Sequence, residues 1–237
     1  MKQNFFQRLK NHWARICLHP IQVYVFHQVS DVFEPETMWA CDWTQTEVFK
    51  QRILALKRKY TFIPLIEVQR HLARDKWRFR NYASLTSDDG WASLTNILPW
   101  LVDQKIPVTL FLNPSCLDGK HGNSRETDKL LTREEVVRIV EQGAPYITIA
   151  SHGWTHKSSL HMTMEEFEES VDKAEKVLGE MPAKIPFFAY VSGLSAQGQA
   201  DCLRERGLTP VYVDRRVNGK DPTLIHRYCI DGGINHE

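Results

Sequence analysis

The feature that most constrains this fold is a regular alternation of short apolar runs with amphipathic segments. This pattern is typical of parallel strands joined by crossover helices, because a parallel connection needs a dozen or more residues. We expect strands over residues 21–27, 61–65, 82–86, 108–112, 146–150, 185–190, 211–213 and 224–230. We expect helices over residues 44–60, 93–104, 132–143, 163–179 and 199–206, and a short one through Val68 and Leu72. The chain is therefore predicted to be α/β, a distorted (β/α) barrel of about seven parallel strands.

Three of the expected helices begin with the capping-box pattern, in which a Thr is followed three residues later by a Glu. The hydroxyl of the first residue and the carboxylate of the fourth each accept a hydrogen bond from a free amide of the first turn. The three pairs are Thr44 with Glu47, Thr132 with Glu135, and Thr163 with Glu166. Gly179 and Gly207 are expected to close the last two long helices.

Residues 1–20 precede the first strand, and we expect a helical extension there, followed by one barrel domain over residues 21–237. Apolar side chains recur in the extension at helical spacing, at Phe5, Leu9, Trp13 and Ile16. The simpler interpretation is a helix that covers the domain. The alternative is a basic amphipathic helix that makes peripheral contact with a membrane surface.

The net charge and the cysteine content narrow the expected partners and cellular compartment of the protein. The formal net charge is +1, which gives no indication of a nucleic-acid partner. The five cysteines are scattered, with no Cys-x-x-Cys, which argues for a reducing compartment. The first twenty residues lack an unbroken apolar run, so we expect no signal peptide and a cytoplasmic location, with membrane association as the variant.

Polar residues follow the expected strands, where a barrel of parallel strands carries its active site. They are His27, Asp88, Asp89, Asn113, His152, Ser192 and Asp214. We expect these side chains to share one face, with Asn113 and Asp214 in contact with substrate.

Asp88-Asp89-Gly90 directly follows an apolar strand. An Asp-Gly pair is common in surface turns, but two adjacent carboxylates repel each other and a metal ion would relieve that repulsion. One carboxylate could bind the metal while the other stays ionised as a base.

His152 and His156 are four residues apart, so a helical turn would direct both imidazoles at one centre. With Asp89 they would form a two-histidine, one-carboxylate metal site with open positions for water. The zinc-protease signature needs Glu after the first His, and Gly153 excludes it.

These motifs resemble the polysaccharide deacetylases (carbohydrate esterase family 4, the NodB homology domain). The family motif T-F-D-D-G is similar to Thr86–Gly90, with Ser87 in place of Phe, and H-[ST]-x-x-H is similar to 152–156 with Gly153 at its second position. The segments VFHQVSD and PVTLFLN resemble the permuted branch, whose barrel begins with a Y-H-x-V strand.

The resemblance implies a divalent metal, usually zinc, held by Asp89, His152 and His156, with Asp88 as general base. In the permuted branch the general acid comes from the first strand, which maps to His27. His226 fits the Leu-x-His motif of the unpermuted branch and is the less favoured acid, because the closing strand resembles the permuted one, where Arg227 is the matched residue.

The third motif departs from the family patterns R-P-P-Y-G and F-A-Y-P-Y-G. Here the segment is Phe188-Ala189-Tyr190-Val191-Ser192-Gly193, without the arginine that orients the base. The Ser192 amide could still form the oxyanion hole. Trp91, Trp154 and Tyr190 are expected either to stack on sugar rings or to pack in the core, and the sequence does not separate these two alternatives.

The resemblance thus implies a metal-dependent hydrolase that removes N-acetyl groups from an amino sugar of a polysaccharide or glycan precursor. Two alternatives remain at this point. One is a catalytically impaired glycan-binding or scaffold protein, and the other is an O-acetyl or N-formyl hydrolase that uses the same site.

Overall fold

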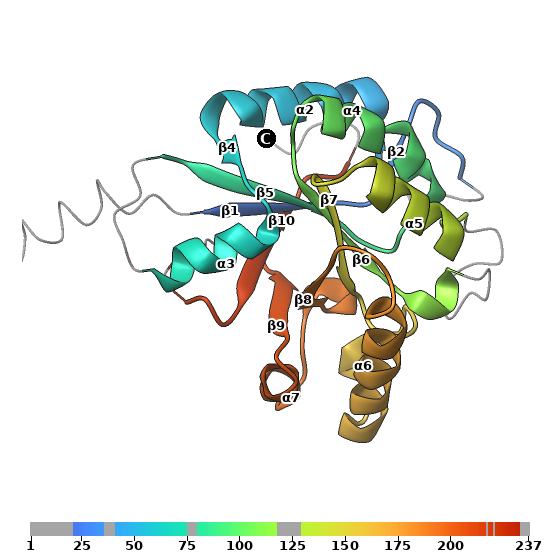
Figure 1. Ribbon diagram of the computed structural model, residues 1–237, viewed down its shortest axis with the longest axis vertical. Helices are drawn as coiled ribbons and strands as arrows, with labels where there is room; N and C mark the ends of the chain where they lie inside the picture. Colours follow the sequence, from blue (N-terminus) through green and yellow to red (C-terminus); the bar gives the residue numbers. More distant parts are fainter. Residues whose placement is uncertain are drawn as a thin grey trace, which may run out of the picture.

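The chain forms a closed barrel of seven parallel strands ringed by helices (Figure 1). The computed structural model describes residues 21–35, 41–74, 80–117, 129–216, 218–219 and 221–232. The strand order is β1-β10-β9-β8-β7-β6-β5, and the pairing of β1 with β5 closes the ring. This confirms the predicted (β/α) barrel. The helix expected over residues 1–20 lies outside the described residues.

The barrel strands follow the predicted apolar runs closely. They are β1 (Gln22–Phe26), β5 (Tyr82–Ser87), β6 (Val108–Leu112), β7 (Ile147–Ser151), β8 (Lys184–Ala189), β9 (Thr209–Val213) and β10 (Ile225–Cys229). The two-residue β4 (Thr61–Phe62) adds to the edge of β5, and β2 (Gln28–Ser30) pairs with β3 (Trp43–Gln45) in a separate parallel ladder.

Six α-helices connect or cover the strands in the described part of the chain. They are α2 (Thr46–Lys59), α3 (Leu65–Ala73), α4 (Leu98–Asp103), α5 (Arg133–Gln142), α6 (Met164–Leu178) and α7 (Gln199–Glu205). Four short 3-10 helices lie between them: η1 (Ala92–Asn96), η2 (Pro114–Cys116), η3 (Ser159–His161) and η4 (Val191–Gly193).

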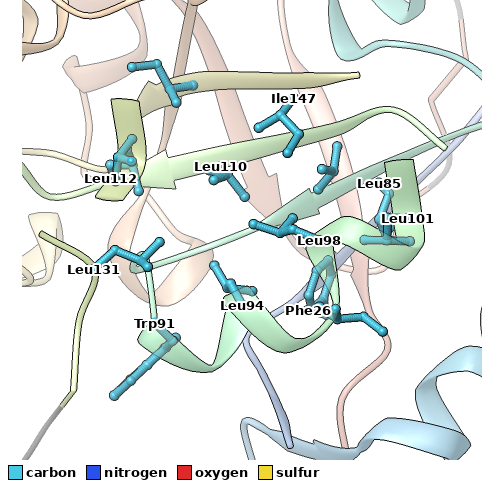
Figure 2. Packing of buried hydrophobic residues seen from close by; sticks show 14 of the residues in the cluster. Phe26, Leu85, Trp91, Leu94, Leu98, Leu101, Leu110, Leu112, Leu131 and Ile147 are labelled. Atoms are coloured by element: carbon cyan, nitrogen blue, oxygen red, sulfur yellow. The ribbon is translucent and has the colours of Figure 1, made fainter. Parts of the chain in front are cut away.

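The hydrophobic core has a part inside the barrel and parts between the barrel and its helices. Inside, Phe111, Phe187 and other inward-facing strand residues pack with Leu65 and Leu72 of α3. Outside, η1 and α4 lay leucines against β5, β6 and β7, as Figure 2 shows. Burying one such side chain stabilises the fold by about 1.5–3 kcal/mol. The rigid scaffold that results fixes the strand ends, which carry the polar residues.

Two of the three predicted capping boxes are confirmed, at Thr132 and Thr163. The prediction at Thr44 is wrong. Thr44 is a buried residue of β3 paired with Val29, and α2 begins after Gln45, whose side chain makes no capping hydrogen bond. The pairing of β3 with β2 therefore outweighs the local capping pattern.

The structure corrects two predicted element bounds, both at prolines. The helix expected over residues 93–104 is divided into η1 and α4, since Pro99 cannot occupy a helix interior and lies in the first turn of α4 instead. The strand expected over residues 61–65 ends early because Pro64 precedes α3. No helix among the described residues has the length and apolar character needed to cross a bilayer.

Candidate active site

Hydrogen bonds between neighbouring strand ends gather the predicted polar residues on one face of the barrel. Asp88 follows β5, and its amide donates to the Phe26 carbonyl at 3.3 Å, next to His27 at the end of β1. His152 follows β7, and its amide donates to the Leu112 carbonyl of β6 at 2.9 Å. The strand ends therefore bring the two motifs together, as the sequence predicts.

A candidate metal-binding group forms where Asp89, His152 and His156 meet. Asp89 Oδ1 lies 3.3 Å from His152 Nε2 and 3.1 Å from His156 Nε2. One ligand atom from each residue lies within 4.8 Å of the other two. The left-handed backbone of Asp89 (φ 72°) and Gly90 (φ 77°) turns the chain sharply, and a Cβ at Gly90 would come within 2.8 Å of Leu112.

The donor set of this group fits a divalent cation. The Ala189 carbonyl accepts a hydrogen bond from His152 Nδ1 at 2.8 Å, so Nδ1 carries the proton and Nε2 presents a lone pair. Asp89 Oδ1 also offers only lone pairs, and it is buried without a hydrogen-bond partner among the described residues. Two acceptors that face each other at 3.3 Å repel unless a cation lies between them. A carboxylate and two imidazoles are ligands typical of zinc.

The charges in this group favour the ligand form of Asp89. Burial acts to raise the pKa of Asp89, but the neighbouring histidines together outweigh it, and its pKa lies well below the usual range. Trp91 Nε1 donates to Asp89 Oδ2 at 3.0 Å and so holds the second oxygen. Asp89 therefore stays ionised with one oxygen directed at the two histidines.

Asn113 shapes the segment that carries the two histidines. That segment is not helical, so both imidazoles reach Asp89 without the helical turn that their spacing would allow. Gly153 is left-handed (φ 86°), and Asn113 Nδ2 lies 2.6–3.2 Å from the carbonyls of His152, Gly153 and Thr155. Asn113 is 1 % exposed, so its side chain holds this loop. The predicted contact of Asn113 with substrate is therefore not supported by its position.

Asp88 forms a buried ion pair with Arg227 of β10. The guanidinium donates to both carboxylate oxygens, at 2.6 and 2.7 Å, and to Thr86 Oγ1 at 3.1 Å. Arg227 is 0 % exposed and lies over the Phe111 ring at 5.0 Å. Burial acts to raise the pKa of Asp88, but Arg227 and His152 outweigh it, and the pKa lies below its ordinary value. Arg227 thus holds both oxygens of the Asp88 carboxylate.

His27 is paired with Asp231, which follows β10. His27 Nδ1 lies 2.5 Å from Asp231 Oδ2, and the His27 amide donates to Oδ1 at 3.1 Å. Burial acts to lower the pKa of His27, but the Asp231 carboxylate outweighs it and places the pKa well above its usual value. The Phe26 carbonyl, which accepts from the Asp88 amide, directly precedes His27, so β1 carries the imidazole beside the Asp88–Asp89 turn.

His226 projects from the opposite face of β10. Side chains alternate along a strand, and Arg227 is wholly buried while His226 is partly exposed. His226 Nδ1 lies 2.8 Å from Asp214 Oδ2, and its ring is tilted against Tyr212. Asp214 therefore pairs with His226.

The altered third motif forms a tight turn after β8, in which Ser192 is exposed between the buried Val191 and Gly193. Ser192 is left-handed (φ 66°, ψ 8°) and exposed, which is a strained conformation for a residue with a Cβ. Gly193 is also left-handed, and a Cβ there would lie 2.6 Å from Val213. The turn is therefore fixed against β9 with Ser192 at its tip.

The three aromatic residues predicted to stack or pack lie in different surroundings. Tyr190 is 0 % exposed and packs with Phe167, Phe188 and Tyr212, so packing applies to it. Trp91 is 5 % exposed and bonds Asp89. Trp154 is half-buried and is therefore the most exposed of the three.

Comparison with known proteins decides the family. The profile of the family described as polysaccharide deacetylase matches residues 78–211, more than half of the chain. The chain belongs to the polysaccharide deacetylase family. None of the curated proteins compared matches the sequence.

Solved structures similar to this family member share its fold at low identity. IcaB from Ammonifex degensii has a TM-score of 0.74 at 19 % identity, covering 90 % of this chain and 92 % of its own. The Streptococcus pyogenes deacetylase PplD in complex with acetate has a TM-score of 0.71 at 18 % identity, covering 90 % and 93 %. A de-N-acetylase from Aggregatibacter actinomycetemcomitans has a TM-score of 0.70 at 15 % identity, covering 89 % and 95 %.

The deacetylase profile covers the Asp88–Gly90 and His152–His156 motifs but not the first and last strands of the barrel. His27 of the β1 edge and Arg227 and Asp231 of the β10 edge lie outside the matched range. Asp231 was missed from sequence, although it follows the last strand as the other polar residues follow theirs. The loop-holding role of Asn113 carries no sequence signal, since it depends on which carbonyls the fold brings within reach.

Proposed function

We propose that this protein is a metal-dependent hydrolase that removes N-acetyl groups from amino sugars of a glycan. The observation that carries the proposal is the Asp89–His152–His156 group, with its facing acceptor atoms, beside the ionised Asp88. Family membership supports glycan deacetylation. The metal requirement, zinc as the metal and the N-acetyl specificity are our proposals.

The base in this mechanism is Asp88. A divalent cation held by Asp89, His152 and His156 would polarise the acetyl carbonyl and lower the pKa of the attacking water toward about 7. Asp88 accepts a proton from that water, since its depressed pKa keeps it ionised at neutral pH. Arg227 fixes the orientation of the carboxylate through its two hydrogen bonds.

The acid in this mechanism is His27. An amine leaves poorly as an anion, so a positioned proton donor is needed as the C–N bond breaks. Asp231 raises the pKa of His27 and holds its Nδ1, which leaves Nε2 to donate. We also propose the permuted motif order, in which the acid comes from the first strand. Two observations support it: Arg227 is buried inside the barrel, and His226 is paired separately with Asp214.

The Ser192 amide is proposed to stabilise the oxyanion. Its exposed left-handed turn presents backbone beside the strand ends, and a backbone donor needs no particular side chain. Trp154 is the remaining candidate for stacking on a sugar ring, because part of its surface is exposed.

The intact charge network argues against the catalytically impaired scaffold. The motive for that alternative is the altered third motif, which lacks the arginine that orients the base in the family pattern. Arg227 pairs with Asp88 through two hydrogen bonds, so the base retains an orienting cation.

A substrate panel tests the proposal. Zinc-loaded protein is incubated with N-acetyl, N-formyl and O-acetyl glucosamine oligosaccharides, and released acetate and formate are quantified. We expect acetate from the N-acetyl substrates, and an Asp88→Asn variant that retains zinc but loses about 10²–10⁴-fold in rate. Release from esters or formamides alone would reassign the substrate, and release from none of them despite bound zinc would overturn the enzymatic proposal.

A further inference from the structure

Three metal-ligating side chains meet outside the Asp89–His152–His156 group. They are His27, Cys229 and Asp231, and one ligand atom from each lies within 4.8 Å of the other two. We propose that this trio is a second metal site, which takes a soft divalent cation such as zinc and thereby blocks His27. The effect on catalysis rests on the proposed function, whereas binding at the trio does not.

The spacing of the donor atoms suits a tetrahedral cation. Zinc bonds of about 2.0 Å to nitrogen and oxygen and about 2.3 Å to sulfur place ligand atoms about 3.3–3.6 Å apart. Cys229 Sγ already lies 3.3 Å from Asp231 Oδ2. His27 Nδ1 and Asp231 Oδ2 are 2.5 Å apart and would separate by about 0.8 Å, so a small rotation of the imidazole accommodates the ion.

The backbone around Asp231 is held before any ion binds. Arg52 of α2 donates to the Ile230 carbonyl at 2.8 Å and to the Gly232 carbonyl at 2.7 Å, on either side of Asp231. The Asp231 side chain is 0 % exposed and is aimed at His27. Cys229 is exposed, which leaves an open approach for an ion. A trio prearranged in this way needs little reorganisation to bind.

The types of ligand select the cation. Thiolate and imidazole favour zinc and other soft or borderline ions, while magnesium and calcium prefer sets made of oxygen alone. Cys229 Sγ and His27 Nδ1 would each release a proton to the solvent on binding, and a water molecule would complete the coordination. The Asp89 group has no sulfur ligand, so the two sites differ in their chemistry.

Occupancy of the trio would remove the acid. His27 donates from Nε2 as an imidazolium and returns to neutral imidazole. With a cation on Nδ1 the ring begins neutral, so loss of the Nε2 proton would give an imidazolate, which is a far poorer step. Excess zinc would therefore inhibit the enzyme while the first site stays loaded.

Cobalt substitution tests binding without using activity. A thiolate ligand gives Co²⁺ an intense near-ultraviolet charge-transfer band that oxygen and nitrogen ligands do not give. We expect this band in the wild type, its loss in Cys229→Ser, and its retention in Cys41→Ser, which removes another exposed cysteine. Absence of the band from the wild type, or its persistence in Cys229→Ser, would overturn the second site.

Zinc inhibition tests the consequence. Acetate release is measured in protein with the first site loaded while further zinc is added, and each variant is compared with its own rate before the addition. Cys229→Ser should need at least about tenfold more zinc for half inhibition than wild type and Cys41→Ser. Equal inhibition of all three would overturn the blocking role. If no acetate is released by any protein, the proposed function fails while the cobalt result still decides the site.

Discussion

Replacing Arg227 with methionine would leave the Asp88 carboxylate buried without its counter-ion. The wild-type guanidinium makes hydrogen bonds of 2.6 and 2.7 Å to Asp88 and is itself 0 % exposed. Breaking a buried pair from one side costs about 3–5 kcal/mol. At about 2–4 °C per kcal/mol for a chain of this size, Tm should fall by about 6–20 °C. Urea unfolding and a thermal melt measure the two quantities.

A surface arginine provides the matched control. Arg204 pairs with Asp201 within α7 at 2.8 Å, and the Asp201 side chain is 78 % exposed. Arg204→Met should therefore cost less than about 1 kcal/mol, since exposed pairs contribute little.

The loss of stability in Arg227→Met should depend on pH in a definite direction. In the wild type Asp88 has a depressed pKa, so its contribution to stability is present above the unfolded pKa and is lost as pH falls through the folded one. In Arg227→Met, burial acts without the arginine and raises the pKa of Asp88. The carboxyl then becomes neutral at a higher pH than in the wild type, and the stability deficit should shrink as pH falls.

A double variant separates the ion pair from simple loss of packing. Asp88→Asn with Arg227→Met removes both charges, so its loss should be clearly smaller than the sum of the two single losses. Additive losses, or an Arg227→Met cost no larger than that of Arg204→Met, would refute the reasoning.

The remaining predictions concern the acid and the histidine loop. His27→Gln should lower the rate of acetate release by about 10²–10⁴-fold, whereas the matched His226→Gln should change it little, and the reverse order would move the acid to His226. Asp231→Asn removes the carboxylate that raises the pKa of His27, so the alkaline limb of the rate profile should move to lower pH, and an unmoved limb would contradict the pairing. Asn113→Ala frees the loop carbonyls and should weaken zinc affinity by about 10–100-fold in a competition titration with a chelator, with unchanged affinity as the contrary result.

The barrel could be predicted from sequence because its strands are continuous apolar runs separated by helices of sufficient length. A strand buried on both faces, such as β6, has few alternative assignments. The first residues of the helices were harder to predict, because a local capping pattern can compete with strand pairing. Thr44 fits a capping box, yet the pairing of β2 with β3 places it inside a strand.

The convergence of the site was predictable, but its supporting contacts were not. Asp88, Asp89, His27 and His152 follow strand ends, and parallel strands end on one face. The spacing of the two histidines would allow a helical turn, but spacing alone does not specify a loop, and Asn113, which follows the neighbouring strand, holds a different conformation. Such partners are distant in sequence and depend on the register between strands.

The measurement that tests the central claim most directly is a zinc titration of chelator-treated protein, with bound zinc and acetate release recorded on the same samples. The metal group of Asp89, His152 and His156 predicts a rate that is near zero without metal and rises in proportion to bound zinc up to one equivalent. It also predicts that Asp89→Asn gains no rate at these concentrations, whatever zinc its His27–Cys229–Asp231 trio takes up. Full activity in metal-free protein, or zinc-restored activity in Asp89→Asn, would contradict the account.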